Sequence, residues 1–94
     1  MAEEERLDEL VLHFTAYPNP FATHTSLKYT LRRPARVSVL ITDVLSGKTV
    51  YRSQFGMQQA GQYTVPLSLY ERPGNYVVTL QYNSKLKSLI VIKN

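Results

Sequence analysis

The side chains that could do acid–base or metal chemistry in this 94-residue chain are few. There are two histidines, His13 and His24, and no cysteine. Without cysteine there is no thiolate nucleophile and no sulfur ligand for a zinc ion. Beyond the first ten residues the only carboxylates are Asp43 and Glu71, which are well separated, whereas acid–base and glycosidase chemistry needs positioned groups that act together. We therefore expect no enzyme, no metal site and no cofactor.

The local context of these residues favours structural roles. Alternation places His13 on the outward side of a strand, and His24 falls in a polar loop. Asp43 closes a strand, where a carboxylate commonly caps a turn. The four glycines are isolated from one another, so they form no phosphate-binding loop. Each glycine instead suits a turn that requires a positive φ angle.

The aromatic residues are the next candidates for ligand recognition. Tyr17, Tyr51 and Tyr70 are the candidates for a surface contact. The other four alternate with aliphatic residues and are expected in the core: Tyr29, Tyr63, Tyr76 and Tyr82. A carbohydrate-binding role would need an exposed aromatic platform, so a structural role is favoured for most of the tyrosines.

Charge is distributed unevenly. The net charge is +4, but the first ten residues hold five acids and one arginine, whereas the rest hold ten basic and two acidic side chains. Such a basic body is either a solvated surface or attracted to an anionic partner, such as a phosphorylated glycolipid or nucleic acid. Only Arg32, Arg33 and Arg36 approach a cluster. This scatter favours a solvated surface and argues against nucleic-acid binding.

Targeting signals are not apparent in the chain. It has no apolar run of the roughly 18 residues that span a bilayer, and its acidic start is the opposite of the basic opening of a signal peptide. We expect a domain that does not span a membrane. If it works outside the cell, we expect the export signal to lie on another part of the protein.

Hydrophobic alternation predicts seven short strands. They are expected near residues 9–14, 27–31, 37–42, 48–55, 63–67, 75–82 and 86–93. In the first, Leu10, Leu12 and Phe14 are expected to point inward. Pro66 predicts an edge position or a bulge for the fifth strand. Gly56 and Gly61 are expected to bracket a loop.

Seven strands separated by turn residues predict an all-β fold, an immunoglobulin-like antiparallel β-sandwich of about seven strands. We expect one domain over residues 10–94. Residues 1–9 are interpreted as an acidic linker or a remnant of cloning, although residues 2–12 also fit a short helix. The last strand, at the C-terminus, is a natural sheet edge.

Several segments, taken in order, resemble the C-terminal sorting domain of the type IX secretion system. The resemblance covers residues 14–94. It is carried by Tyr17-Pro18-Asn19-Pro20-Phe21, by residues 37–48 (VSVLITDVLSGK), by Ala60-Gly61-Gln62-Tyr63, by residues 73–80 (PGNYVVTL) and by residues 87–93 (KSLIVIK). The family often has Lys or Arg before the final aliphatic run, where this chain has Ser88, with Lys87 one place earlier.

The resemblance implies a non-catalytic signal. It implies that the outer-membrane secretion machinery recognises the domain and carries a larger cargo through periplasm and outer membrane to the cell surface. It also implies a sortase-like protease that usually removes the domain, here in the acidic linker, and that can join the cargo to an anionic lipopolysaccharide. We expect Gly74, Tyr76, Lys87 and Lys93 to shape or form the recognised surface, although a turn and a core position equally explain the first two.

The alternative is a structural or adhesive immunoglobulin-like module appended to a secreted protein. Similar Pro-Asn-Pro and Gly-x-Tyr patterns occur in the flagellar hook-capping protein and in modules of secreted hydrolases.

Overall fold

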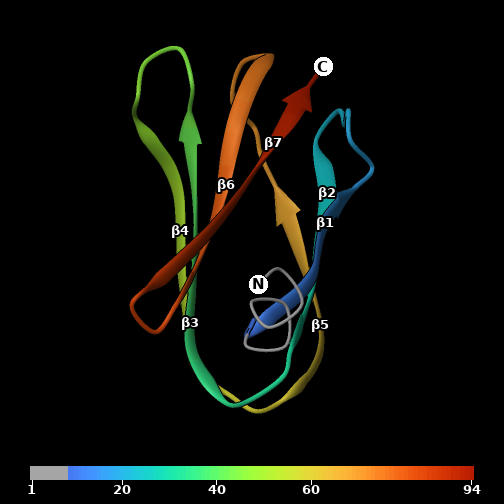
Figure 1. Cartoon of the computed structure of the whole chain (residues 1–94). Coiled ribbons are helices and arrows are strands. Elements are labelled where there is room, and N and C mark those ends of the chain that lie inside the picture. The colour runs from blue at the N-terminus through green and yellow to red at the C-terminus, as the bar shows by residue number, and fades with distance from the viewer. Residues whose placement is uncertain (1–8) are drawn as a thin grey trace, which may run out of the picture.

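The computed structural model describes residues 9–94, and this part of the chain is all-β (Figure 1). The seven strands are β1 (Val11–Tyr17), β2 (His24–Leu31), β3 (Ala35–Asp43), β4 (Thr49–Gln58), β5 (Gly61–Ser68), β6 (Gly74–Tyr82) and β7 (Lys85–Lys93). They form two antiparallel sheets packed together, with strand orders β1-β2-β5 and β4-β3-β6-β7. The predicted all-β sandwich is confirmed. No helix in residues 9–94 is long and apolar enough to cross a membrane.

The connections explain the strand orders. Three hairpins, β1-β2, β3-β4 and β6-β7, stay within one sheet, and the other three connections cross between the sheets. Two of these crossings lie at the bottom of Figure 1. The fourth strand pairs with the third, whereas in constant-type immunoglobulin domains it pairs with the fifth. The edge strands β1 and β7, from different sheets, contact each other.

The core lies between the sheets and is built by period-two alternation, because successive side chains of a strand point to opposite faces. On β2, Leu27, Tyr29 and Leu31 are buried, as predicted. The same holds for the inward residues of β3 and β6, which are Val37, Val39, Ile41, Tyr76, Val78, Leu80 and Tyr82. Of the four tyrosines expected in the core, three are buried and Tyr63 packs against the core.

In β1 the predicted inward set is partly wrong. Leu10 is buried and Phe14 packs against the core, but Leu12 does not belong to it and Val11 is fully buried instead. The reason is a β-bulge. The register runs from Leu12 opposite Thr30 to Thr15 opposite Lys28, so two residues of β1 oppose one of β2. One of the two, His13, has a φ of 55°, and the extra residue exchanges the inward and outward positions along the strand.

The prediction for Gly56 is also wrong, because the residue lies inside β4 rather than in the following loop. Gly56 opposes Val37 while Gln54 opposes the next residue, Ser38, so a bulge lengthens the strand here. A φ of 70° at Gly56 suits this bulge, since a side chain would be strained in that conformation. The prediction for Pro66 is confirmed, because β5 is an edge strand.

Candidate recognition site

Two of the residues that could do chemistry, His24 and Asp43, are held in contacts within the domain. His24 is the first residue of β2, not part of a loop as predicted, and its Nδ1 lies 2.9 Å from the hydroxyl oxygen of Ser68. Its ring meets Tyr70 edge to face. Asp43 caps the turn after β3, as predicted: its Oδ1 accepts a hydrogen bond from the Leu45 amide at 3.0 Å. Within residues 9–94, no three histidine or acidic side chains lie close enough to hold a metal ion.

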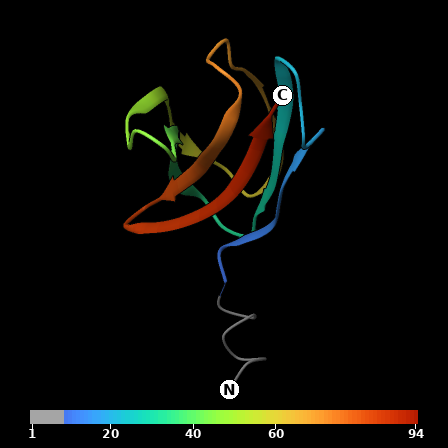
Figure 2. The ribbon, with the colours of Figure 1, turned by 90° about the horizontal axis from the view of Figure 1, so that it is seen from above.

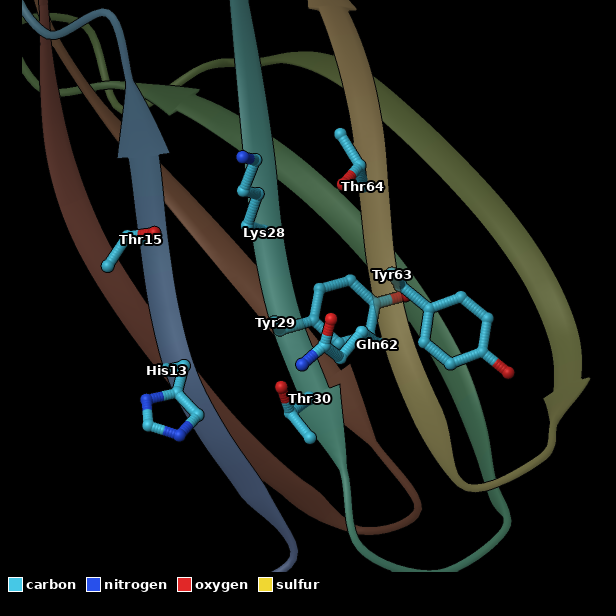
Figure 3. Close-up of a pocket in the computed structure, with 8 residues that line it drawn as sticks. All are labelled: His13, Thr15, Lys28, Tyr29, Thr30, Gln62, Tyr63 and Thr64. Carbon is cyan, nitrogen blue, oxygen red and sulfur yellow. The ribbon is translucent and has the colours of Figure 1, made fainter.

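A hollow of about 310 Å³ lies on the three-stranded sheet beside the β1 bulge (Figure 3). Its lining residues come from all three strands, and each carries a polar group: His13, Thr15, Lys28, Tyr29, Thr30, Gln62, Tyr63 and Thr64. His13 lies at one end, and Lys28 and Thr64 lie toward the other. The side chains that line the hollow include no carboxylate, and its single imidazole has no acid–base partner there. The arrangement does not assemble the paired groups of a hydrolytic site.

The predicted residues Gly74 and Tyr76 belong to a structural corner at the start of β6. The Tyr76 side chain is 0% exposed, and its hydroxyl donates a hydrogen bond to the carbonyl of Arg72 at 2.6 Å. Burial, and secondarily the nearby Asp43 carboxylate, raises the pKa of this hydroxyl. The guanidinium of Arg72 in turn pairs with Asp43 at 2.6 Å. Because the ring of Tyr76 is buried, it cannot contact a partner of the folded domain. Gly74 and Tyr76 can therefore shape a recognised surface, but the side chain of Tyr76 cannot be part of it.

The predicted residues Lys87 and Lys93 lie on β7 at different places. Lys93 is opposite Gly74, whereas Lys87 is opposite Leu80, near the β6-β7 hairpin. The two lysines are six positions apart along the strand, a distance of about 20 Å. The ammonium group of Lys87 forms an ion pair with Glu9. The structure therefore brings Gly74, Tyr76 and Lys93 together at one end of β7 and leaves Lys87 apart.

Sequence reasoning missed a contact between the Pro-Asn-Pro-Phe segment and β7. The side chain of Asn19 behaves like the backbone of an added strand. Its Nδ2 donates to the carbonyl of Ile90 at 3.0 Å, and its Oδ1 accepts from the amide of Ile92 at 2.9 Å. The prolines on both sides of Asn19 predicted a rigid turn, but no local signal showed what that turn would meet.

Phe21 extends this contact. Its amide donates to the carbonyl of Ile92 at 2.9 Å, and its carbonyl accepts from the amide of Asn94 at 2.8 Å. These bonds form a parallel bridge between Phe21 and Lys93, and the Phe21 side chain enters the core. Figure 2 shows the C-terminal end of β7 beside the β1-β2 connection. We call residues 18–21 the edge clamp, because they cover the outer edge of the last part of β7.

The outward face of β7 is apolar and exposed. Leu86, Ile90 and Ile92 are 62%, 58% and 44% exposed. The inward residues Leu89 and Val91 pack on the core, so residues 89–92 are apolar on both faces. Strands with two apolar faces are usually buried between other layers, and an exposed hydrophobic edge strand invites pairing with another chain.

Fold and site together define a small β-sandwich module whose distinctive surface is an edge strand and its clamp. A family model of the secretion system C-terminal sorting domain matches residues 15–93. The chain therefore belongs to the family of C-terminal sorting domains of the type IX secretion system. Comparison with curated proteins gives no significant match. The family match starts within β1 and ends at the last residue of β7, so it includes both the edge clamp and the part of β7 that the clamp covers.

Proposed function

We propose that this domain is a non-catalytic signal that directs a larger cargo through the type IX secretion apparatus to the cell surface, and that β7 with its clamp is the surface the apparatus reads. The supporting observation is the contact of Asn19 and Phe21 with the C-terminal strand. It joins the first and the last family-like segments into one continuous surface. Gly74 and Tyr76 shape this surface from beneath, and Lys93 lies within it.

We also propose where a sortase-like protease cuts, and the proposal is supported by the way the start of the sandwich is held. Leu10 is buried, and its carbonyl accepts a hydrogen bond from the amide of Arg32 at 2.9 Å. Glu9 is held by the ion pair with Lys87. A protease needs a segment that can enter its active site in an extended form. We therefore place the cleavage before Glu9, within residues 1–8, which leaves the whole sandwich on the removed piece.

In this proposal the covalent chemistry belongs to the protease, which can join the cargo to an anionic lipopolysaccharide. The domain contributes shape and a recognised surface.

A fusion experiment tests the proposal. The 94-residue chain is fused behind a periplasmic reporter and expressed in a host that has the type IX apparatus and in the same host lacking it. Surface display of the reporter only in the first host is expected. A reporter that stays in the periplasm of both hosts would refute the sorting role and favour the alternative of a structural or adhesive module.

The cleavage site has its own measurement. Mass spectrometry of the released reporter and of the removed domain gives the residue at which the chain is cut. A new N-terminus between residues 1 and 9 is expected. A cut inside the sandwich, beyond Leu10, would contradict the proposed position.

A further inference from the structure

The edge clamp covers only part of β7. The carbonyl of Ile90 and the amide of Ile92 point away from β6 toward Asn19. Because backbone direction alternates along a strand, the amides and carbonyls of Leu86 and Ser88 point to the same free side. Within residues 9–94 no group is hydrogen-bonded to these four backbone groups. Among the described residues nothing pairs with the first half of β7, which we call the open edge.

The side chains beside this open edge suit an apolar partner. Leu86 and Ile90 flank Ser88 on the outward face and are more than half exposed. Val77 of β6 lies opposite Ile90 and extends the apolar face onto the neighbouring strand. Strand addition joins backbone pairing to contacts of alternate side chains. The open edge offers both free backbone groups and exposed apolar side chains.

Charge indicates the kind of partner. Neither β6 nor β7 contains an acidic residue, whereas β7 contains Lys85, Lys87 and Lys93. In residues 9–94 ten basic side chains stand against three acidic ones, and two of these, Glu9 and Asp43, are already in ion pairs. A second copy would bring lysines near lysines along the paired strands, which destabilises strand pairing. An acidic segment would be attracted instead.

We propose that the open half of β7 binds an extended acidic segment of a partner protein by strand addition. The partner's backbone pairs with Leu86 and Ser88, and its apolar side chains pack on Leu86 and Ile90. This inference rests on the proposed function, because it takes the partner to be a component of the secretion apparatus.

The test uses the reporter fusion with variants of the open edge. Ser88→Pro removes an amide from the open side and leaves the backbone hydrogen bonds between β6 and β7 in place. It also removes the side-chain hydrogen bond between the hydroxyls of Ser88 and Thr79, 3.0 Å apart, so its stability must be measured beside its display. Its matched control is Thr64→Pro on the edge strand β5. There Pro66, two residues on, already lacks an amide in a strand that pairs only with β2. Thermal unfolding of each purified 94-residue chain shows whether the variants fold equally well.

We expect Ser88→Pro to lower surface display about tenfold, the effect of losing roughly one hydrogen bond and its neighbouring contacts, while Thr64→Pro leaves display unchanged. The double variant Leu86→Thr/Ile90→Thr, which places strand-favouring threonines at both exposed positions, should lower display without lowering the unfolding temperature. If Ser88→Pro fails to fold, the double variant decides whether the open edge is needed for display. Lys85→Glu should lower display because it repels an acidic segment.

Other results would overturn the inference. Display at the parent level for Ser88→Pro, or for the double variant, excludes strand addition and leaves the sorting role intact. Unchanged display of Lys85→Glu excludes an acidic partner. A concentration-dependent dimer of the purified chain that Ser88→Pro dissociates would identify a second copy as the occupant. Failure of the unmodified fusion to reach the surface would refute the sorting function itself.

Discussion

The amide of Ile92 donates a hydrogen bond to the side-chain oxygen of Asn19, 73 residues away in the sequence, at 2.9 Å. With the bond from Asn19 to the carbonyl of Ile90, this contact turns a side-chain amide into a substitute for a neighbouring strand. It partly covers the edge of β7, where unpaired backbone groups would otherwise invite aggregation.

Replacing Asn19 should therefore destabilise the domain. Asn19→Ala removes both bonds to β7, and since the site is exposed to water we expect a loss of about 1–2 kcal/mol in the free energy of unfolding. Denaturant unfolding measures it. Asn75→Ala is the control, because the Asn75 side chain is exposed and makes no hydrogen bond within residues 9–94. Equal stability of the two variants would contradict a structural role for the clamp.

The turn after β3 should depend on Asp43. Asp43→Ala removes both the cap on the Leu45 amide and the ion pair with Arg72, and we expect a loss of about 1–3 kcal/mol. Asp43→Asn keeps an oxygen for the cap and should lose less, since the Arg72 side chain is half exposed and the ion pair is screened by water. Chemical unfolding of both variants gives the comparison. An equal loss would mean that the charge, not the cap, holds the turn.

The two faces of the four-stranded sheet should respond differently to truncation. Leu80→Ala empties a fully buried position on β6 and should cost about 2–5 kcal/mol. Leu86→Ala removes a similar side chain from the exposed face of β7 and should change stability by no more than about 0.5 kcal/mol. Thermal and denaturant unfolding measure both. A large loss from Leu86→Ala would show that this face is covered in the isolated chain.

Alkaline pH should unfold the domain through its buried tyrosines. Burial is the main cause that raises the pKa values of Tyr29 and Tyr76 above the ordinary 10.0. These hydroxyls therefore lose their protons less readily in the folded state than in the unfolded state. Their stabilising contribution is complete below about pH 10 and is lost as the pH rises through the raised values.

The measurement is the unfolding temperature between about pH 8 and 11. Tyr76→Phe should be less stable at neutral pH because it leaves the Arg72 carbonyl without its donor. Its decline with alkaline pH should be shallower, since one tyrosine no longer ionises on unfolding. If the unfolding temperature of Tyr76→Phe fell with pH as steeply as that of the parent, Tyr76 would be excluded as a cause of the alkaline unfolding.

The candidate site was predicted only in part. The alternation of apolar and polar residues correctly predicted that the Tyr76 side chain points inward from β6. It therefore also indicated that the residue could belong to the core. The position of β7 at a sheet edge was also expected. However, Lys87 and Lys93 were grouped with Gly74 and Tyr76 by sequence motif, and the strand register separates Lys87 from the other three. The role of Asn19 was not foreseen, because a hydrogen bond between residues 19 and 92 leaves no local pattern.

The sequence by itself determined the all-β fold, the approximate strands, the core positions of β2, β3 and β6 and the family. These follow from local rules, because a strand with one buried face must alternate and a turn must contain residues that permit its angles. Only the tertiary structure decided the bulge at His13, the strand orders, and the contact of Asn19 and Phe21 with β7. Those features depend on which distant edges meet when the two sheets pack, and that is a property of the whole chain.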